Sequence, residues 1–70
     1  MSFSYNKLWK LLIDKNMMKT ELQEAIGMSP ATLAKMGKNE PISMNTVGRI
    51  CKELKCDVGD ILEYIEDETD

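Results

Sequence analysis

The sequence predicts an all-α fold, a compact bundle of five helices that makes up one small domain. Apolar residues recur at spacings of three and four along most of the 70-residue chain, which is the pattern of amphipathic helices. Residues that cap or break helices separate these stretches, and no segment has the pattern of a strand. The composition, with 43% apolar and 30% charged residues, is that of a folded globular domain.

The first predicted helix covers residues 5–15, with Ser4 as its N-terminal cap. It is apolar around more of its circumference than a single core contact requires. We therefore expect either that the core surrounds this helix or that part of it contacts a partner. Its apolar residues are Tyr5, Leu8, Trp9, Leu11, Leu12 and Ile13.

Two short helices at residues 19–26 and 30–36 are expected next, joined by one tight turn. Gly27 can adopt the left-handed conformation that ends a helix without a Cβ clash. Ser29 can cap the following helix, and Pro30 fits its first position, where the missing N–H costs nothing. Two short helices around such a turn form a helix-turn-helix, an arrangement typical of proteins that read DNA.

The rest of the chain is predicted to form two more helices. The fourth covers residues 44–55 and follows a cap at Ser43. Asp57 is expected to cap the fifth, with the Asp60 carboxylate as a partner of that cap. The fifth helix completes the core with Ile61, Leu62 and Ile65. These elements give one domain over residues 1–65, followed by an acidic, frayed tail at residues 66–70.

Charge is divided unevenly along the chain, whose net charge is −3. Residues 57–70 contain seven acidic and no basic residues, whereas residues 1–56 contain all nine Lys and Arg and five acidic residues. A basic body can bind phosphates if the acidic tail points away from them. The tail can equally serve solubility alone, and both interpretations stay open.

Several kinds of site are not expected. The chain contains no histidine, the commonest general base and metal ligand, and no nucleophile is paired with a base. Cys51 and Cys56 lack the further ligands that a zinc site needs. We therefore expect no catalytic activity, no metal and no cofactor. The longest uncharged apolar run is too short to cross a membrane, and no secretory signal is recognisable, so the sequence predicts a cytoplasmic location.

The segments MKTELQEAIGMSPATLAKM and ICKELKCDVGDIL resemble the Xre-type helix-turn-helix domains of phage repressors and Cro, and in particular short stand-alone bacterial regulators. The resemblance extends over residues 5–65. It implies the lambda-repressor-like fold of five helices and a DNA-binding regulator of transcription, with repression as the expected mode. Thr or Ser commonly caps the second helix in this family, but Met18 stands here, so we expect that helix to start late with Thr20 as a substitute cap.

The resemblance also implies which residues contact DNA. The helix at residues 30–36 would lie in the major groove and present Pro30, Ala31, Thr32 and Lys35 to base edges. Lys35 is the best candidate for the N7 and O6 atoms of guanine. Phosphate contacts are implied for Lys19, Ser29, Lys38 and Asn39.

The expected partners are double-stranded DNA and a second copy of the chain. One small domain offers few base contacts, and a homodimer on a palindromic site doubles them. The predicted dimer surface consists of Trp9, Ile61, Tyr64 and Ile65. The alternative is a protein-interaction module of the same fold, as in an antitoxin or anti-repressor. Net acidity, the apolar first helix and the poor base-reading side chains of the third helix favour this alternative.

Overall fold

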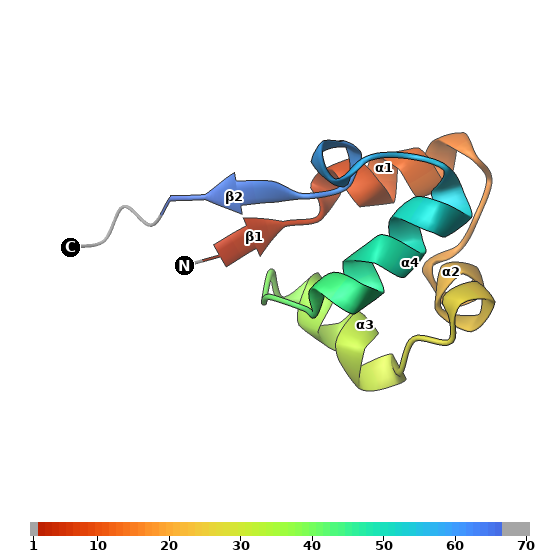
Figure 1. Ribbon diagram of the computed structural model, residues 1–70, viewed down its shortest axis with the longest axis horizontal. Helices are drawn as coiled ribbons and strands as arrows, with labels where there is room; N and C mark the ends of the chain where they lie inside the picture. The colour runs from red at the N-terminus through yellow and green to blue at the C-terminus, as the bar shows by residue number, and fades with distance from the viewer. Residues whose placement is uncertain (1, 67–70) are drawn as a thin grey trace.

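The computed structural model describes residues 2–66, which form four α-helices, one 3-10 turn and a two-stranded sheet (Figure 1). The helices are α1 Asn6–Asp14, α2 Lys19–Ile26, α3 Pro30–Gly37 and α4 Met44–Leu54. The 3-10 turn is η1 Val58–Asp60, and the strands are β1 Ser2–Ser4 and β2 Glu63–Ile65. The prediction of a helical helix-turn-helix fold is thus confirmed for the four helices, whereas the prediction of five helices and no strand is wrong.

The predicted starts of α1 and α2 need correction. Tyr5, and not Ser4, occupies the N-cap position of α1, although the Ser4 hydroxyl accepts the N–H of Asn6 at 3.2 Å. Helix α2 begins at Lys19 and does not start late at Thr20. Its first turn is stabilised by the Glu21 carboxylate, which accepts the N–H of Met18 at 2.8 Å. A carboxylate three residues into a helix supplies the acceptor from the helix side, so a methionine at the N-cap is tolerated.

The predicted fifth helix does not form, although its capping residues act as expected. The Asp57 carboxylate accepts the N–H of Val58 at 2.8 Å, and the N–H of Asp57 donates to the Asp60 carboxylate at 2.9 Å. These bonds close only the short turn η1. The chain then extends into β2, which pairs antiparallel with β1 from the other end of the sequence.

The two strands form a ribbon that projects from the helical body and brings both ends of the described chain to the same side (Figure 1). Ser2 pairs with Ile65, Phe3 with Tyr64 and Ser4 with Glu63. The rings of Phe3 and Tyr64 meet edge to face, with centroids 5.8 Å apart. Such cross-strand aromatic pairs help to fix the register of a short ribbon.

The core lies between the four helices and the chain that follows η1. Burial of one large apolar side chain in this core stabilises the fold by roughly 1.5–3 kcal/mol relative to its exposure to water. The buried apolar residues are Tyr5, Leu8, Leu12, Leu22, Met28, Met36, Val47, Ile50, Leu54 and Ile61. Within residues 2–66, none of the helices has the length and apolar character needed to cross a membrane.

Candidate nucleic-acid interface

The turn between α2 and α3 is closed by the left-handed conformation of Gly27, whose φ is +70°. The N–H of Gly27 donates to the carbonyl of Glu24 at 3.3 Å, and the N–H of Met28 donates to the carbonyl of Gln23 at 2.9 Å. Both bonds satisfy carbonyls at the C-terminal end of α2. Because the Met28 side chain is also buried in the core, the turn fixes the angle between the two helices.

Hydroxyl groups organise the N-terminal end of α3. The Ser29 hydroxyl accepts the N–H of Thr32 at 3.2 Å, and the two hydroxyl oxygens lie 2.9 Å apart. Pro30 occupies the first helical position, as predicted. Thr32 is half-buried and its hydroxyl is bonded to Ser29, so its methyl group is the part that remains for a ligand.

Besides Gly37 at its last position, four residues of α3 are exposed: Pro30, Ala31, Ala34 and Lys35. Three of them were predicted from the sequence to face base edges. Ala34 was missed because an alanine in a short helix looks like a core residue. Its position, three residues after Ala31, is the one signal that would have placed it on this face. Lys35 is the one cation among these four residues.

Lys19 is held at the start of α2 by an aromatic ring of α1. Its ammonium nitrogen lies 4.2 Å from the centroid of the Trp9 ring, which is the geometry of a cation–π contact. The neighbouring carboxylate of Glu21 occupies the N–H of Met18. The N–H of Met18 is therefore not available to a phosphate. The group at this end of α2 that is predicted to contact phosphate is the ammonium group of Lys19.

The loop after α3 places Lys38 and Asn39 on the surface, and both side chains are exposed. This loop is anchored to the beginning of the chain. The carbonyl of Asn39 accepts the N–H of Phe3 at 3.3 Å, and the carbonyl of Glu40 accepts the hydroxyl of Tyr5 at 2.6 Å. Burial of the Tyr5 side chain raises the pKa of its hydroxyl. Phe3 of β1 and Tyr5 at the N-cap of α1 thus support the loop whose residues Lys38 and Asn39 are predicted to contact phosphate.

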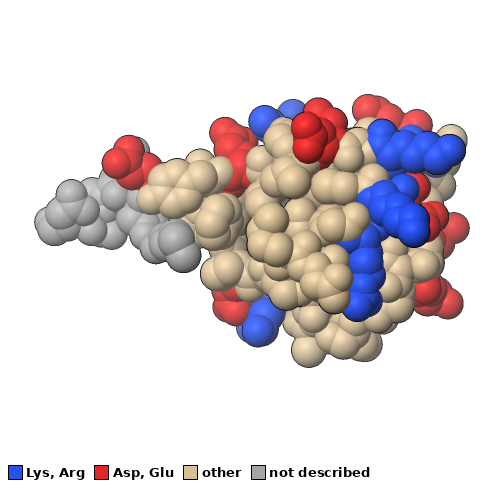
Figure 2. All heavy atoms as spheres, in the orientation of Figure 1, with Lys and Arg blue, Asp and Glu red and all other residues tan. Residues whose placement is uncertain are grey.

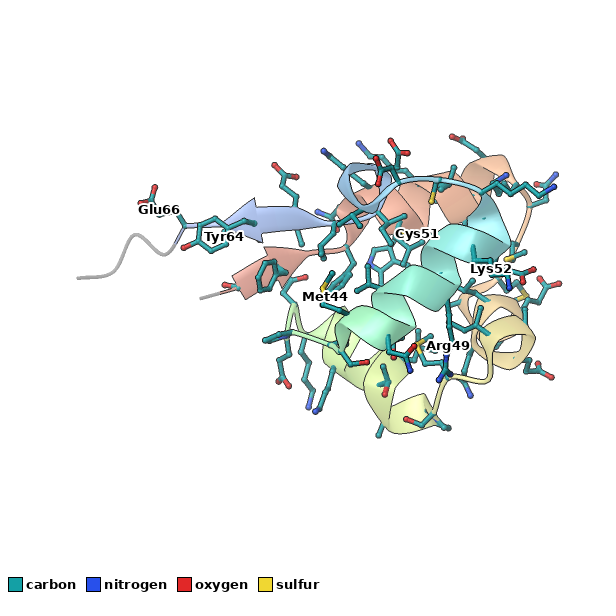
Figure 3. The ribbon with its side chains drawn as sticks, viewed as in Figure 1. Met44, Arg49, Cys51, Lys52, Tyr64 and Glu66 are labelled. Carbon is teal, nitrogen blue, oxygen red and sulfur yellow. The ribbon has the colours of Figure 1, made fainter. Side chains whose placement is uncertain are left out.

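Arg49 and Lys52, which the sequence presents as ordinary surface charges, lie on α4 (Figure 3), and Figure 2 shows basic side chains gathered on this part of the surface. Arg49 Nη1 donates to the carbonyl of Ile26 at 3.3 Å. This contact places a cation at the C-terminal end of α2, where the helix dipole is negative. Arg49 therefore joins α4 to the helix-turn-helix, a role that no local pattern in the sequence indicates.

The residues predicted for the dimer surface do not all lie on the surface. Ile61 is 1% exposed and belongs to the core, so its side chain does not face a partner in this fold. Tyr64 and Ile65 are 58% and 36% exposed and lie on β2 (Figure 3). Trp9 is half-buried and lines a different surface, the groove between α1 and the start of α2.

The two cysteines lie side by side at the C-terminal end of α4. The N–H of Cys56 donates to the carbonyl of Cys51 at 3.0 Å. Burial raises the pKa of the Cys56 thiol, and the adjacent Cys51 thiol adds to this effect. No cluster of three or more His, Cys, Asp or Glu residues that could hold a metal ion is present in residues 2–66.

A family model described as a Cro/C1-type HTH DNA-binding domain matches residues 7–67, nearly the whole chain. The chain belongs to the Cro/C1-type helix-turn-helix family. The Xre-type resemblance of its sequence is thereby confirmed, and the family is one of DNA-binding regulators of transcription.

Two other proteins are similar to this Cro/C1-type chain. The uncharacterized HTH-type transcriptional regulator YozG of Bacillus subtilis (strain 168) is 45% identical over 60 residues, which cover 83% of this chain and 71% of YozG. The crystal structure of the transcriptional regulator VanUg is 55% identical and superimposes with a TM-score of 0.92, covering 94% of this chain and 88% of VanUg.

Proposed function

We propose that this Cro/C1-type protein binds a palindromic DNA site as a homodimer, reads the major groove with α3 and represses transcription from the promoter it occupies. The observation that carries the proposal is the exposed face of α3, capped at Ser29 and rigidly joined to α2 by Gly27 and Met28. A rigid helix with an exposed N-terminal half is what the major groove accommodates.

In this proposal, the α3 face contacts the bases in two ways, through apolar methyl groups and through one charged side chain. The methyl groups of Ala31, Ala34 and Thr32 contact thymine methyl groups, and the Lys35 ammonium group donates to guanine. Lys19, Lys38, Ser29 and Asn39 contact the phosphate backbone on either side. With one long polar side chain per helix, specificity requires two copies on one site, which is why we expect a homodimer.

The proposal is tested by fluorescence anisotropy with the full chain, a duplex selected from a random library and an unselected duplex. We expect affinity for both duplexes to fall as salt rises, because lysines displace counterions from phosphates. Lys35→Ala should weaken binding to the selected duplex about 10-fold or more and binding to the unselected duplex much less. Lys10→Ala, which removes an exposed lysine of α1, is the matched control and should change neither.

Two results would contradict the proposal. The first is the absence of salt-dependent binding to any duplex. The second is an equal loss on both duplexes for Lys35→Ala, which would make Lys35 a phosphate contact and leave α3 without a base-reading side chain.

A second candidate function is supported by the groove between α1 and α2. It is lined mainly by apolar residues, and Ile13 and Met18 at its margin are 72% and 68% exposed. Exposed apolar surface of this kind is typical of a protein-binding site. This function is favoured over DNA binding by two results together: the chain binds no DNA, and Ile13→Ser abolishes capture of a co-purifying protein. The protein would then act as an antitoxin or anti-repressor.

A further inference from the structure

The two cysteines occupy paired positions of the turn that ends α4. The helix ends at Leu54, and the next residue, Lys55, is left-handed with φ +52°. The N–H groups of Lys55 and Cys56 both donate to the carbonyl of Cys51, the second at 3.0 Å. In a turn of this kind, the side chain after the left-handed residue commonly contacts the side chain five positions earlier. Here both side chains are thiols, so the turn brings Cys51 and Cys56 together.

The two thiols differ in their access from the surface. Both cysteines are half-buried and pack against the core, and Cys51 lies in the last turn of α4 (Figure 3). Cys56 also lines a surface groove of about 400 Å³ between α1, the end of α4 and η1, whereas Cys51 is not among the residues that line it. A molecule in this groove would therefore meet Cys56 first, with Cys51 next to it.

The groove beside Cys56 is basic. Four lysines and two aspartates line it, so their net charge is +2. A groove of one sign of charge raises the local concentration of small molecules of the opposite sign. It therefore favours an anion over a cation as the molecule that reaches Cys56. The charged residues are Lys7, Lys10, Lys15 and Lys55 with Asp14 and Asp60.

We propose that Cys56 is a modification site for small anionic disulfides and that Cys51 then resolves the modified thiol into a Cys51–Cys56 disulfide. First, the Cys56 thiolate attacks one sulfur of the reagent, whose S–S bond breaks, and one half leaves as a thiolate. Next, the Cys51 thiolate attacks the Cys56 sulfur, and the second half leaves. The two protein thiols give up two protons and two electrons, and the reagent takes up both and becomes two thiols. The inference is independent of DNA binding.

The surroundings of Cys56 slow this exchange but stabilise its product. Burial, the adjacent Cys51 thiol and Asp60 raise the pKa of Cys56, whereas Lys15 lowers it. Less thiolate is therefore present at neutral pH, and the first step is slow. A disulfide is strongly oxidising when its reduced form is stabilised, and a raised thiol pKa acts in the opposite direction. We therefore expect a slow reaction whose product resists reduction.

The disulfide would join the last turn of α4 to the segment that enters η1. Cys56 directly precedes Asp57, the N-cap of η1. Closing the loop over residues 51–56 restricts the unfolded chain more than the folded one, in which the turn is already formed. We therefore expect the thermal midpoint of the oxidised chain to lie about 5 °C or more above that of the reduced chain.

The test treats the full reduced chain with dithiodiglycolate, an anionic disulfide, and with cystamine, a cationic one. Intact mass spectrometry and peptide mapping follow the products, and each rate is divided by the rate of the same reagent with 2-mercaptoethanol. We expect a loss of about 2 Da from the formation of the Cys51–Cys56 disulfide. At low salt the anionic reagent should act about 10-fold faster than cystamine after this correction, and the ratio should fall as salt rises.

Cysteine variants test the order of the two steps. Cys51→Ser should accumulate the mixed disulfide at Cys56, because the resolving thiol is gone. Cys56→Ser should react at least about 10-fold more slowly, because its remaining thiol does not line the groove. Circular dichroism checks that both variants are folded.

Lysine variants test the charge of the groove. Lys10→Met combined with Lys55→Met should abolish the preference for the anionic reagent, and neither residue is among the groups that shift the pKa of Cys56. Lys52→Met is the matched control, since Lys52 is an exposed lysine of α4 outside this groove, and it should keep the preference.

Three results would overturn the inference. The first is a folded chain that carries mixed disulfides and no Cys51–Cys56 disulfide. The second is a corrected rate for cystamine equal to that of the anionic reagent. The third is a faster reaction of Cys56→Ser than of Cys51→Ser, which would make Cys51 the site of attack. A reaction seen in the chain unfolded by urea and absent from the folded chain would equally exclude the site.

Discussion

At the scale of single residues, the contact between Lys19 and Trp9 links a side chain predicted to bind phosphate to the chain's single tryptophan. If the Lys19 ammonium group moves from the Trp9 ring to a phosphate, the electric field at the indole changes, and indole fluorescence depends on that field. We therefore expect Trp9 fluorescence to change when duplex DNA is added. Lys19→Met should remove most of this change and lower the slope of log affinity against log salt by about one.

The fluorescence test has an internal control in Lys38→Met, which removes a predicted phosphate contact that is not near Trp9. This variant should lower the salt slope by a similar amount and keep the fluorescence response. An unchanged response in Lys19→Met would show that Lys19 stays on the ring in the complex and that its ammonium group does not contact phosphate.

The family resemblance of the sequence pointed to most of the exposed α3 face but not to the contacts that constrain it. The resemblance implied base contacts for Pro30, Ala31 and Lys35; all three are exposed, and the contacts themselves stay a prediction. The bond between the Ser29 and Thr32 hydroxyls follows from helix capping and could be anticipated. The contact between Arg49 and the carbonyl of Ile26 joins residues 23 positions apart, which no local spacing can reveal.

At the scale of elements, replacing a glycine by alanine is expected to have opposite effects on stability in the turn after α2 and inside α4. Gly27 has φ +70° and open space around the position of a Cβ, so Gly27→Ala should cost about 1–2 kcal/mol, the penalty of a left-handed residue. Gly48 lies inside α4, also with open space, so Gly48→Ala should stabilise the fold by about 0.5–1 kcal/mol. Urea unfolding of both variants measures the two values. A loss of stability in Gly48→Ala would contradict the helical geometry of α4.

The elements that the sequence predicted correctly are those whose stability is local. Helices α3 and α4 carry their own caps, spacing and turn residues, and their ends were predicted to within one residue. Helix α2 occupies the predicted range 19–26, although the late start expected because of Met18 was wrong. The segment after Asp57 also carries caps, but η1 ends at Asp60. The residues that follow are pairing partners of Ser2–Ser4, and β structure depends on such distant partners more than on local preference. The strand was therefore not visible from its own residues.

At the scale of the whole molecule, stability should fall in alkaline solution. Burial raises the pKa of Tyr5 above its ordinary value of 10.0 and, with the adjacent Cys51, that of Cys56 above 9.0. The unfolded chain therefore loses these protons first as pH rises. The stability contributed by the protonated groups is complete below about pH 9 and is lost progressively above it.

The alkaline loss is measured by urea unfolding between neutral pH and about pH 11, where the tyrosine of the unfolded chain is largely ionised. Tyr5→Phe should be less stable at neutral pH by about 1 kcal/mol, because the hydrogen bond to the Glu40 carbonyl is lost. It should also lose less stability as pH rises. Equal slopes for the two proteins would show that Tyr5 does not cause the effect.

The charge distribution of the whole chain is consistent with both proposals. All nine Lys and Arg residues precede Asp57 and lie on the helical body, where Figure 2 shows them interspersed with acidic side chains, whereas β2 lies in a part of the sequence that has acidic and no basic residues. The predicted tail at residues 66–70 lies, apart from Glu66, outside the described part of the chain, so the division into a domain at residues 1–65 and a tail stays a prediction. The helical body is therefore the part that we expect to approach DNA.

The pairing of β1 with β2 has a consequence for the order of events during synthesis. Strand β1 leaves the ribosome about 60 residues before β2, which at typical rates of translation means several seconds. During that interval β1 has no partner, and the loop after α3 has its contacts with Phe3 and Tyr5 but not a completed ribbon behind them. The helix-turn-helix can thus assemble on the nascent chain, whereas the ribbon can form only once β2 has emerged. The ribbon is therefore the last part of the described fold that can form.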